Sequence, residues 1–129
     1  MSTLLLIFNH RLTFFQEENA RKALGVKNIV NLSDELQELW SNVPPELPEI
    51  KDYLKPIEAW LSAKARAGDY VLIQGDFGAC YLMVKYALEH NLAPVYSTTQ
   101  REVIEEEQTN GAVKVIHHFQ HEIFRRYER

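Results

Sequence analysis

Cysteine is almost missing from this chain of 129 residues, in which Cys80 is the only one. A lone cysteine excludes an internal disulfide and a cysteine-rich zinc site, and it fits a reducing cytoplasm. Long apolar runs are missing as well, because residues 4–8 are too few for a membrane span or a secretion signal and lack a basic start. We therefore expect a cytoplasmic protein without membrane association, in which Cys80 fills space in the core.

Positive charge is also scarce, because 14 Lys and Arg stand against 18 Asp and Glu. The net charge of −4 argues against DNA or duplex RNA as a partner, although a few local donors suffice for a small anion. Metal-binding motifs are missing too. His117, His118 and His121 are close in sequence, but consecutive strand residues point to opposite faces, so only one of the first two can join His121. The sequence predicts neither a metal site nor a cofactor.

What is present fits one α/β domain over residues 1–129, since 46% of the residues are hydrophobic and 25% are charged. Short apolar runs predict four strands, at residues 3–8, 27–32, 70–73 and 92–97. Right-handed crossovers place the first and third strands side by side, the second outside one and the fourth outside the other. The strand order therefore reverses between the first and third strands, which is where ligands bind in such sheets.

Helices are predicted between the strands. Thr13 with Gln16 forms a capping box for a helix that ends near Leu24, before Gly25, and Ser33 caps the next helix. The proline-rich residues 43–48 predict a loop. Residues 49–67 predict a helix that Pro56 either divides or kinks.

A β-hairpin is predicted after residue 101. Thr109-Asn110-Gly111 separates residues 102–108 from residues 112–119, and Asn-Gly favours a type I′ turn with positive φ at both central positions. Three consecutive glutamates, Glu105 to Glu107, make one strand of the hairpin acidic. They form either a solvated edge or a lid over a ligand.

The segment Gly75-Asp76-Phe77-Gly78 joins the third strand to a helix predicted from Ala79 to about residue 90. Unpaired N–H groups at such a helix start suit an anion, and glycine lets a ligand approach the backbone. The spacing is neither the dinucleotide fingerprint nor a P-loop. A tight turn with Asp76 as the helix cap is the alternative interpretation.

Polar residues follow three neighbouring strands and should meet at one edge of the sheet. They are Asn9, His10 and Arg11 after the first strand, the Gly-Asp-Phe-Gly turn after the third, and Thr98, Thr99 and Arg101 after the fourth. Such an edge suits a phosphodiester, whose cleavage needs no metal when a 2′-hydroxyl is held in line with its own phosphate. His10 would be the base or make a structural hydrogen bond. Arg101 would stabilise developing charge or pair with Glu105.

Five segments together resemble the CRISPR-associated Csx-twenty family: FNHRLT (8–13), LQELWSNVPP (36–45), GDFGA (75–79), YSTTQRE (96–102) and FRRYE (124–128). The resemblance implies a CARF-like, Rossmann-like fold: a mostly parallel sheet flanked by helices, here with a C-terminal β-hairpin. It also implies a homodimer that binds a cyclic oligoadenylate, since a two-fold dimer reproduces the symmetry of a cyclic tetranucleotide.

The activity that the resemblance implies is that of a ring nuclease. Such an enzyme degrades cyclic tetra-adenylate without a metal and switches off type III CRISPR signalling. The matching positions with an implied role in binding or catalysis are Asn9, His10, Arg11, Gly75, Asp76, Phe77, Gly78, Ala79, Thr98, Thr99, Arg101 and Glu102. Two alternatives are a related protein that binds the messenger without cutting it, and an unrelated protein-interaction domain.

Overall fold

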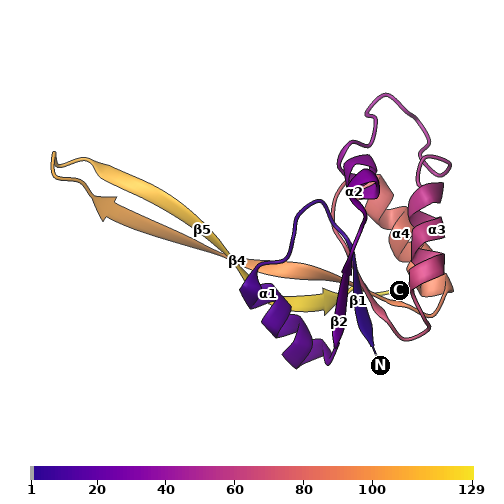
Figure 1. The fold of residues 1–129 in the computed structure, drawn as a ribbon. Coiled ribbons are helices and arrows are strands. Elements are labelled where there is room, and N and C mark those ends of the chain that lie inside the picture. The colour runs from indigo at the N-terminus through magenta and orange to yellow at the C-terminus, as the bar shows by residue number, and fades with distance from the viewer. Residues whose placement is uncertain (1) are drawn as a thin grey trace.

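The structure is a computed structural model that describes residues 2–129 (Figure 1). In chain order its elements are β1 (Thr3–Ile7), α1 (Phe14–Asn19), a π-helical turn (Ala20–Leu24), β2 (Asn28–Asn31), α2 (Asp34–Ser41), α3 (Lys55–Lys64), β3 (Tyr70–Ile73), α4 (Phe77–Glu89), β4 (Ala93–Glu107) and β5 (Val113–Arg126).

The sheet has five strands in the order β2-β1-β3-β4-β5. β1 runs parallel to β2 and β3, β3 runs parallel to β4, and β5 is antiparallel to β4. The predicted α/β class and the order of the parallel strands are confirmed. β1 and β3 are the strands between which the order reverses.

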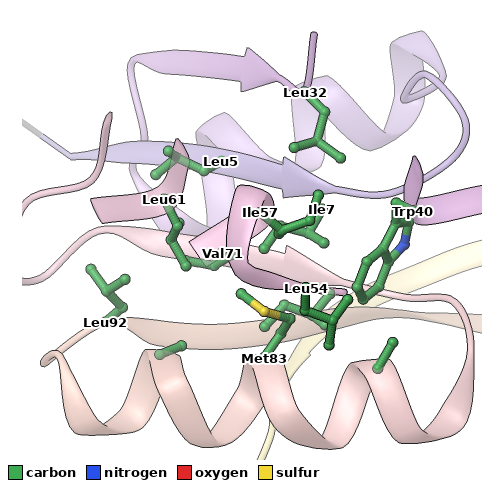
Figure 2. Close-up of a cluster of buried hydrophobic side chains, with 13 residues drawn as sticks. Leu5, Ile7, Leu32, Trp40, Leu54, Ile57, Leu61, Val71, Met83 and Leu92 are labelled. Carbon is green, nitrogen blue, oxygen red and sulfur yellow. The ribbon is translucent and has the colours of Figure 1, made fainter. Parts of the chain in front are cut away.

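Both faces of the sheet are covered, which explains why β1 and β3 lack polar alternation. Leu5 and Ile7 point into a core with α2, α3 and α4. Figure 2 shows this core, with Trp40 of α2 at one end. Leu4 and Leu6 point the opposite way, into a second core with Ala20 of the π-helical turn. In Figure 1, α1 accordingly lies on one side of the sheet and the other three helices lie on the opposite side.

The helix ends follow the capping signals. Thr13 and Gln16 form the predicted capping box, Ser33 caps α2, and Gly25 ends the π-helical turn with φ at +70°. The helix predicted over residues 49–67 is shorter than expected, because α3 begins only at Lys55. Pro56 lies in its first turn, where a missing N–H and a fixed φ are tolerated, and the preceding residues form turns.

The predicted hairpin is part of the sheet. β4 is one continuous strand of 15 residues, and its second half pairs with β5 far from the helices. We call residues 100–120 the arm; Figure 1 shows it projecting away from the rest of the molecule as a two-stranded ribbon.

The type I′ turn was a wrong prediction. Of Asn110 and Gly111, only Gly111 has positive φ, at +82°. Gly111 N–H donates to Gln108 O at 3.0 Å, and Gln108 N–H donates to Ala112 O at 2.7 Å. The loop is thus a tight turn followed by one left-handed glycine, a common solution for longer hairpin loops.

Among the helices of residues 2–129, none has both the length and the apolar character that crossing a membrane requires.

Candidate functional site

The ends of β1 and β3 and the bulged part of β4 near Ser97 meet around one residue, Gln74, which directly follows β3. Its N–H donates to Ile7 O of β1 at 3.2 Å. Its Oε1 accepts the N–H of Ser97 in β4 at 2.7 Å. Gln74 therefore bonds to both neighbouring strands, and we call the edge formed by residues 9–11, 74–78 and 97–98 the rim.

Helix α2 supports the rim from behind. The indole Nε1–H of Trp40 donates to Gln74 O at 2.8 Å, and Gln37 Nε2 donates to Phe8 O at 3.5 Å. Trp40 is buried, so the tips of β1 and β3 are both attached to a fixed element. An indole fixed in this way positions the backbone of the rim.

Asn9, His10 and Arg11 are all exposed at the end of β1. The His10 ring lies edge-on to Phe8, with ring centroids 5.3 Å apart. An exposed imidazole and an exposed guanidinium at consecutive positions offer a ring that can donate or accept a hydrogen bond and a permanent cation. This part of the predicted site is accessible to a ligand.

Asp76 is the N-cap of α4, as the alternative interpretation had it. Its carboxylate accepts the N–H of Ala79 at 3.0 Å. The helix start therefore already holds a negative charge. Gly78 and the buried Ala79 belong to α4 itself, whereas the Phe77 side chain is 94% exposed and free to stack on a ligand.

Gly75 has a structural role that the sequence did not reveal. A Cβ at this position would lie 2.7 Å from Trp40 Nε1, which is closer than real contacts allow. A Cβ at Gly78 would lie 3.5 Å from Asp76 Oδ2, an ordinary contact. The absence of a side chain at Gly75 thus makes room for Trp40.

The residues predicted to follow the fourth strand lie within β4, and not all of them reach the rim. Thr98 sits in a bulge, where its Oγ1 accepts from Ile123 N–H at 3.1 Å and donates to Ile123 O at 3.2 Å. Arg101 and Glu102 lie on the arm, and Arg101 bonds to His117 Nδ1 at 2.8 Å rather than pairing with Glu105. The continuous β4 carries Arg101 about 13 Å and Glu102 about 17 Å beyond Ser97. Thr99, opposite His121 and exposed, lies between these two regions.

A polar cluster beside the rim was missed by the sequence analysis. His121 Nδ1 accepts from the Ser97 hydroxyl at 2.5 Å, and His121 Nε2–H donates to Asn19 Oδ1 at 2.7 Å. Gln16 Nε2 donates to Ser97 Oγ at 3.3 Å. The cluster connects α1 to β4 and β5. Its partners are up to 102 residues apart in the chain, so no local spacing could reveal it.

His121 is only 7% exposed. Burial lowers its pKa, and the nearby Glu122 carboxylate opposes that shift. The imidazole is therefore neutral at pH 7, which its Nδ1 must be to accept the hydrogen bond from the Ser97 hydroxyl. The three C-terminal histidines do not gather, because His121 faces α1 while His117 bonds Arg101 on the arm. Within residues 2–129 no three or more His, Cys, Asp or Glu side chains are placed to share a metal ion.

Cys80 packs against the larger core and is partly buried, as predicted. Burial raises the pKa of its thiol to about 11; the Gly75 backbone hydrogen bond lowers the pKa and the Asp76 carboxylate raises it. A thiol that stays protonated is a weak nucleophile.

An apolar cleft of about 770 Å³ begins next to the rim and runs along the exposed side of α4. Gly75 and Phe77 lie at the rim end, Leu88 lies farther along, and Tyr96 and Tyr127 form the opposite wall. The Tyr127 hydroxyl donates to Ile73 O at 2.7 Å, which fixes this wall to β3. The lining is mostly apolar, with Lys85, Glu128 and Arg129 as its charged residues, so the cleft is mainly a surface for apolar contact.

A family model described as "Uncharacterized protein MJ1673 family" matches residues 2–125 of the chain. The protein MJ1673 of the archaeon Methanocaldococcus jannaschii is 48% identical over 127 residues, which cover 98% of each chain. No solved structure matches the chain.

Proposed function

The chain belongs to the MJ1673 family, and we propose that it is a ring nuclease that binds cyclic tetra-adenylate at the rim and cleaves it without a metal. One observation carries the proposal: the ends of β1 and β3 and Ser97 of β4 converge on Gln74 and leave Asn9, His10 and Arg11 exposed beside them. The resemblance to the Csx-twenty family supports the choice of ligand. We further propose a CARF-like, Rossmann-like fold and a cytoplasmic location.

The proposed ligand fits the exposed groups of the rim. Arg11 contacts a phosphate through its guanidinium, and the exposed Phe77 ring stacks on an adenine. A homodimer provides two rims, related by the two-fold axis that a cyclic tetranucleotide also has. Each rim then needs only enough positive charge for half of the ligand, which reconciles an anionic chain with an anionic substrate.

The proposed reaction is attack of a ribose 2′-oxygen on the adjacent phosphorus. His10 takes the 2′-hydroxyl proton while the bond from phosphorus to the 5′-oxygen breaks, and the 5′-oxygen then takes a proton from solvent. The products are a 2′,3′-cyclic phosphate and a 5′-hydroxyl. Arg11 stabilises the charge that develops on the phosphate oxygens. The proposed site does not include Arg101 and Glu102, because both lie on the arm.

A second candidate function is binding of the messenger without cleavage. One reason is the position of Arg101: a residue predicted to be catalytic lies on the arm and not at the rim. The other is the Asp76 carboxylate, which accepts the Ala79 N–H and so occupies a donor at the start of α4 that could have stabilised a reacting phosphate. A binding protein needs only the rim.

Incubation of the purified protein with cyclic tetra-adenylate in EDTA separates these functions. We expect linear products from the native chain, about 100-fold or more slower turnover with His10→Ala, and weaker binding with Arg11→Ala. Arg21→Ala, which removes an exposed arginine paired with Glu17 away from the rim, should match the native protein. Intact substrate at stoichiometric enzyme, together with tight binding, would select the binding function.

A further inference from the structure

The arm has one apolar face that nothing in the structure covers. Opposite residues in the register from Thr99↔His121 to Glu107↔Val113 share a face, so the odd-numbered residues lie together. This face includes four large apolar side chains with exposed fractions between 50% and 68%: Val103, Val113, Val115 and Phe119. A two-stranded ribbon without support is marginally stable in water, so this face needs a partner surface.

The cleft beside α4 is the matching open surface. Beyond Phe77 of the rim, Tyr81 lies one helical turn farther along α4 and is 67% exposed. Cys80, Val84 and Leu88 also line the cleft; they are partly buried by the body of the molecule but remain open to solvent from the cleft side. Aromatic side chains in an open apolar groove are typical of interface centres.

The two surfaces carry opposite charge. The odd-numbered face of the arm has two carboxylates, Glu105 and Glu107, against one cation, Arg101. Lys85 and Arg129 line the cleft with Glu128, and Arg125 and Arg126 line the hollow next to it. None of these four cations takes part in an ion pair within residues 2–129, where the pairs found are Arg21–Glu17 and Lys55–Asp52.

The dimensions also agree. The arm leaves the body of the molecule just after Ser97 and Thr98 of β4, and the cleft begins at the end of β3, so both open onto the rim. Ten residues of ribbon span about 33 Å, which exceeds the length of about 20 Å of the 13-residue α4.

We propose that two copies of this chain exchange arms, each laying the odd-numbered face of its arm into the α4 cleft of the other. The exchange brings the two rims together and closes the space between them with protein. It specifies how the homodimer of the proposed function forms, yet it requires no nucleotide. Its test is therefore independent of any activity.

The mass of the full-length chain in solution, measured by light scattering without nucleotide over a range of concentrations, tests the exchange. The native chain should be a dimer. Val115→Asp on the arm and Tyr81→Asp in the cleft change exposed side chains, and each should weaken the dimer by about 30-fold or more. Ile104→Asp, on the even-numbered face of the arm, is the matched control and should leave the dimer intact.

Mixing the two weakened variants makes the test specific. Val115→Asp retains a normal cleft and Tyr81→Asp retains a normal arm, so a mixed dimer keeps one of the two contacts. The mixture should therefore dimerise more tightly than either variant alone. A monomeric native chain, a dimeric Tyr81→Asp variant, or equal damage from Ile104→Asp and Val115→Asp would each overturn the proposal.

Discussion

At the scale of single residues, Gly75 and Trp40 determine the shape of the rim. The indole occupies the space that any side chain at Gly75 would need, and it also bonds to the Gln74 carbonyl. Gln74 in turn bonds to β1 and β4. Adding one methyl group at Gly75 should therefore displace Trp40 and, through Gln74, the parts of β1, β3 and β4 that form the rim.

Gly75→Ala should lower the free energy of unfolding by about 1–3 kcal/mol, because buried Trp40 has no room to move away. Gly78→Ala is the matched control. Its Cβ meets only ordinary contacts within α4, where alanine is the better helix former, so stability should be unchanged or rise by up to about 1 kcal/mol. Urea unfolding of both variants measures the difference, and equal stabilities would contradict this role for Trp40.

His121 should make stability depend on pH. Because burial lowers its pKa, the folded chain binds a proton there less readily than the unfolded chain does. Its contribution is complete above the unfolded pKa of about 6.5 and is lost as pH falls toward the lower folded value. The urea concentration at the unfolding midpoint should therefore decrease as the pH is lowered from 7.5 to 5.5.

His121→Gln tests this assignment. It should cost about 1–3 kcal/mol at pH 7.5, since Ser97 and Asn19 lose their partner, and should flatten the pH dependence. His90→Gln, at an exposed position, serves as the control and should keep the native pH dependence. A pH slope that His121→Gln leaves unchanged would show that another group causes it.

At the scale of elements, the start of α4 combines a cap with the proposed anion site. The carboxylate of Asp76 stabilises the helix but repels phosphate. Asp76→Asn should keep the fold and bind cyclic tetra-adenylate about two- to fivefold more tightly, whereas Asp76→Ala should cost about 1 kcal/mol of stability. Calorimetric titration measures both affinities. Weaker binding by Asp76→Asn would mean that the carboxylate itself contacts the ligand.

Local signals predicted most elements and failed where tertiary structure decided the outcome. Capping residues located the starts of α1 and α2, and apolar runs located β1 and β3. The pattern changes at Arg101, and this was interpreted as a separate hairpin. The true cause is that β4 leaves the core there, so its residues lose their buried face without leaving the strand.

At the scale of the whole molecule, the arm is separate from the body. Neither buried core contains a residue between 96 and 120. A variant in which a short turn replaces residues 100–120 should therefore keep its helices and strands, with the free energy of unfolding of the monomer within about 1 kcal/mol of the native value. Circular dichroism during urea unfolding checks this. A body that fails to fold would show that the arm belongs to the core.

The candidate site was predictable only in part. The rule that ligands bind where strand order reverses placed Asn9, His10 and Arg11 beside the turn after β3. The same rule does not predict how far β4 continues, so Arg101 was expected at the rim although it lies on the arm. It also could not pair Ser97 with His121 and Asn19, because that contact depends on how α1 packs against the sheet.

The central claim is that the rim binds a cyclic oligoadenylate, and amide chemical shifts test it most directly. The titrant is cyclic tetra-adenylate with 2′-O-methyl riboses, which lacks the attacking hydroxyl and stays intact. We expect the largest shifts at residues 9–11, 74–78 and 97–98. Shifts that are absent at saturating ligand, or that fall only on the arm or along the α4 cleft, would contradict the account.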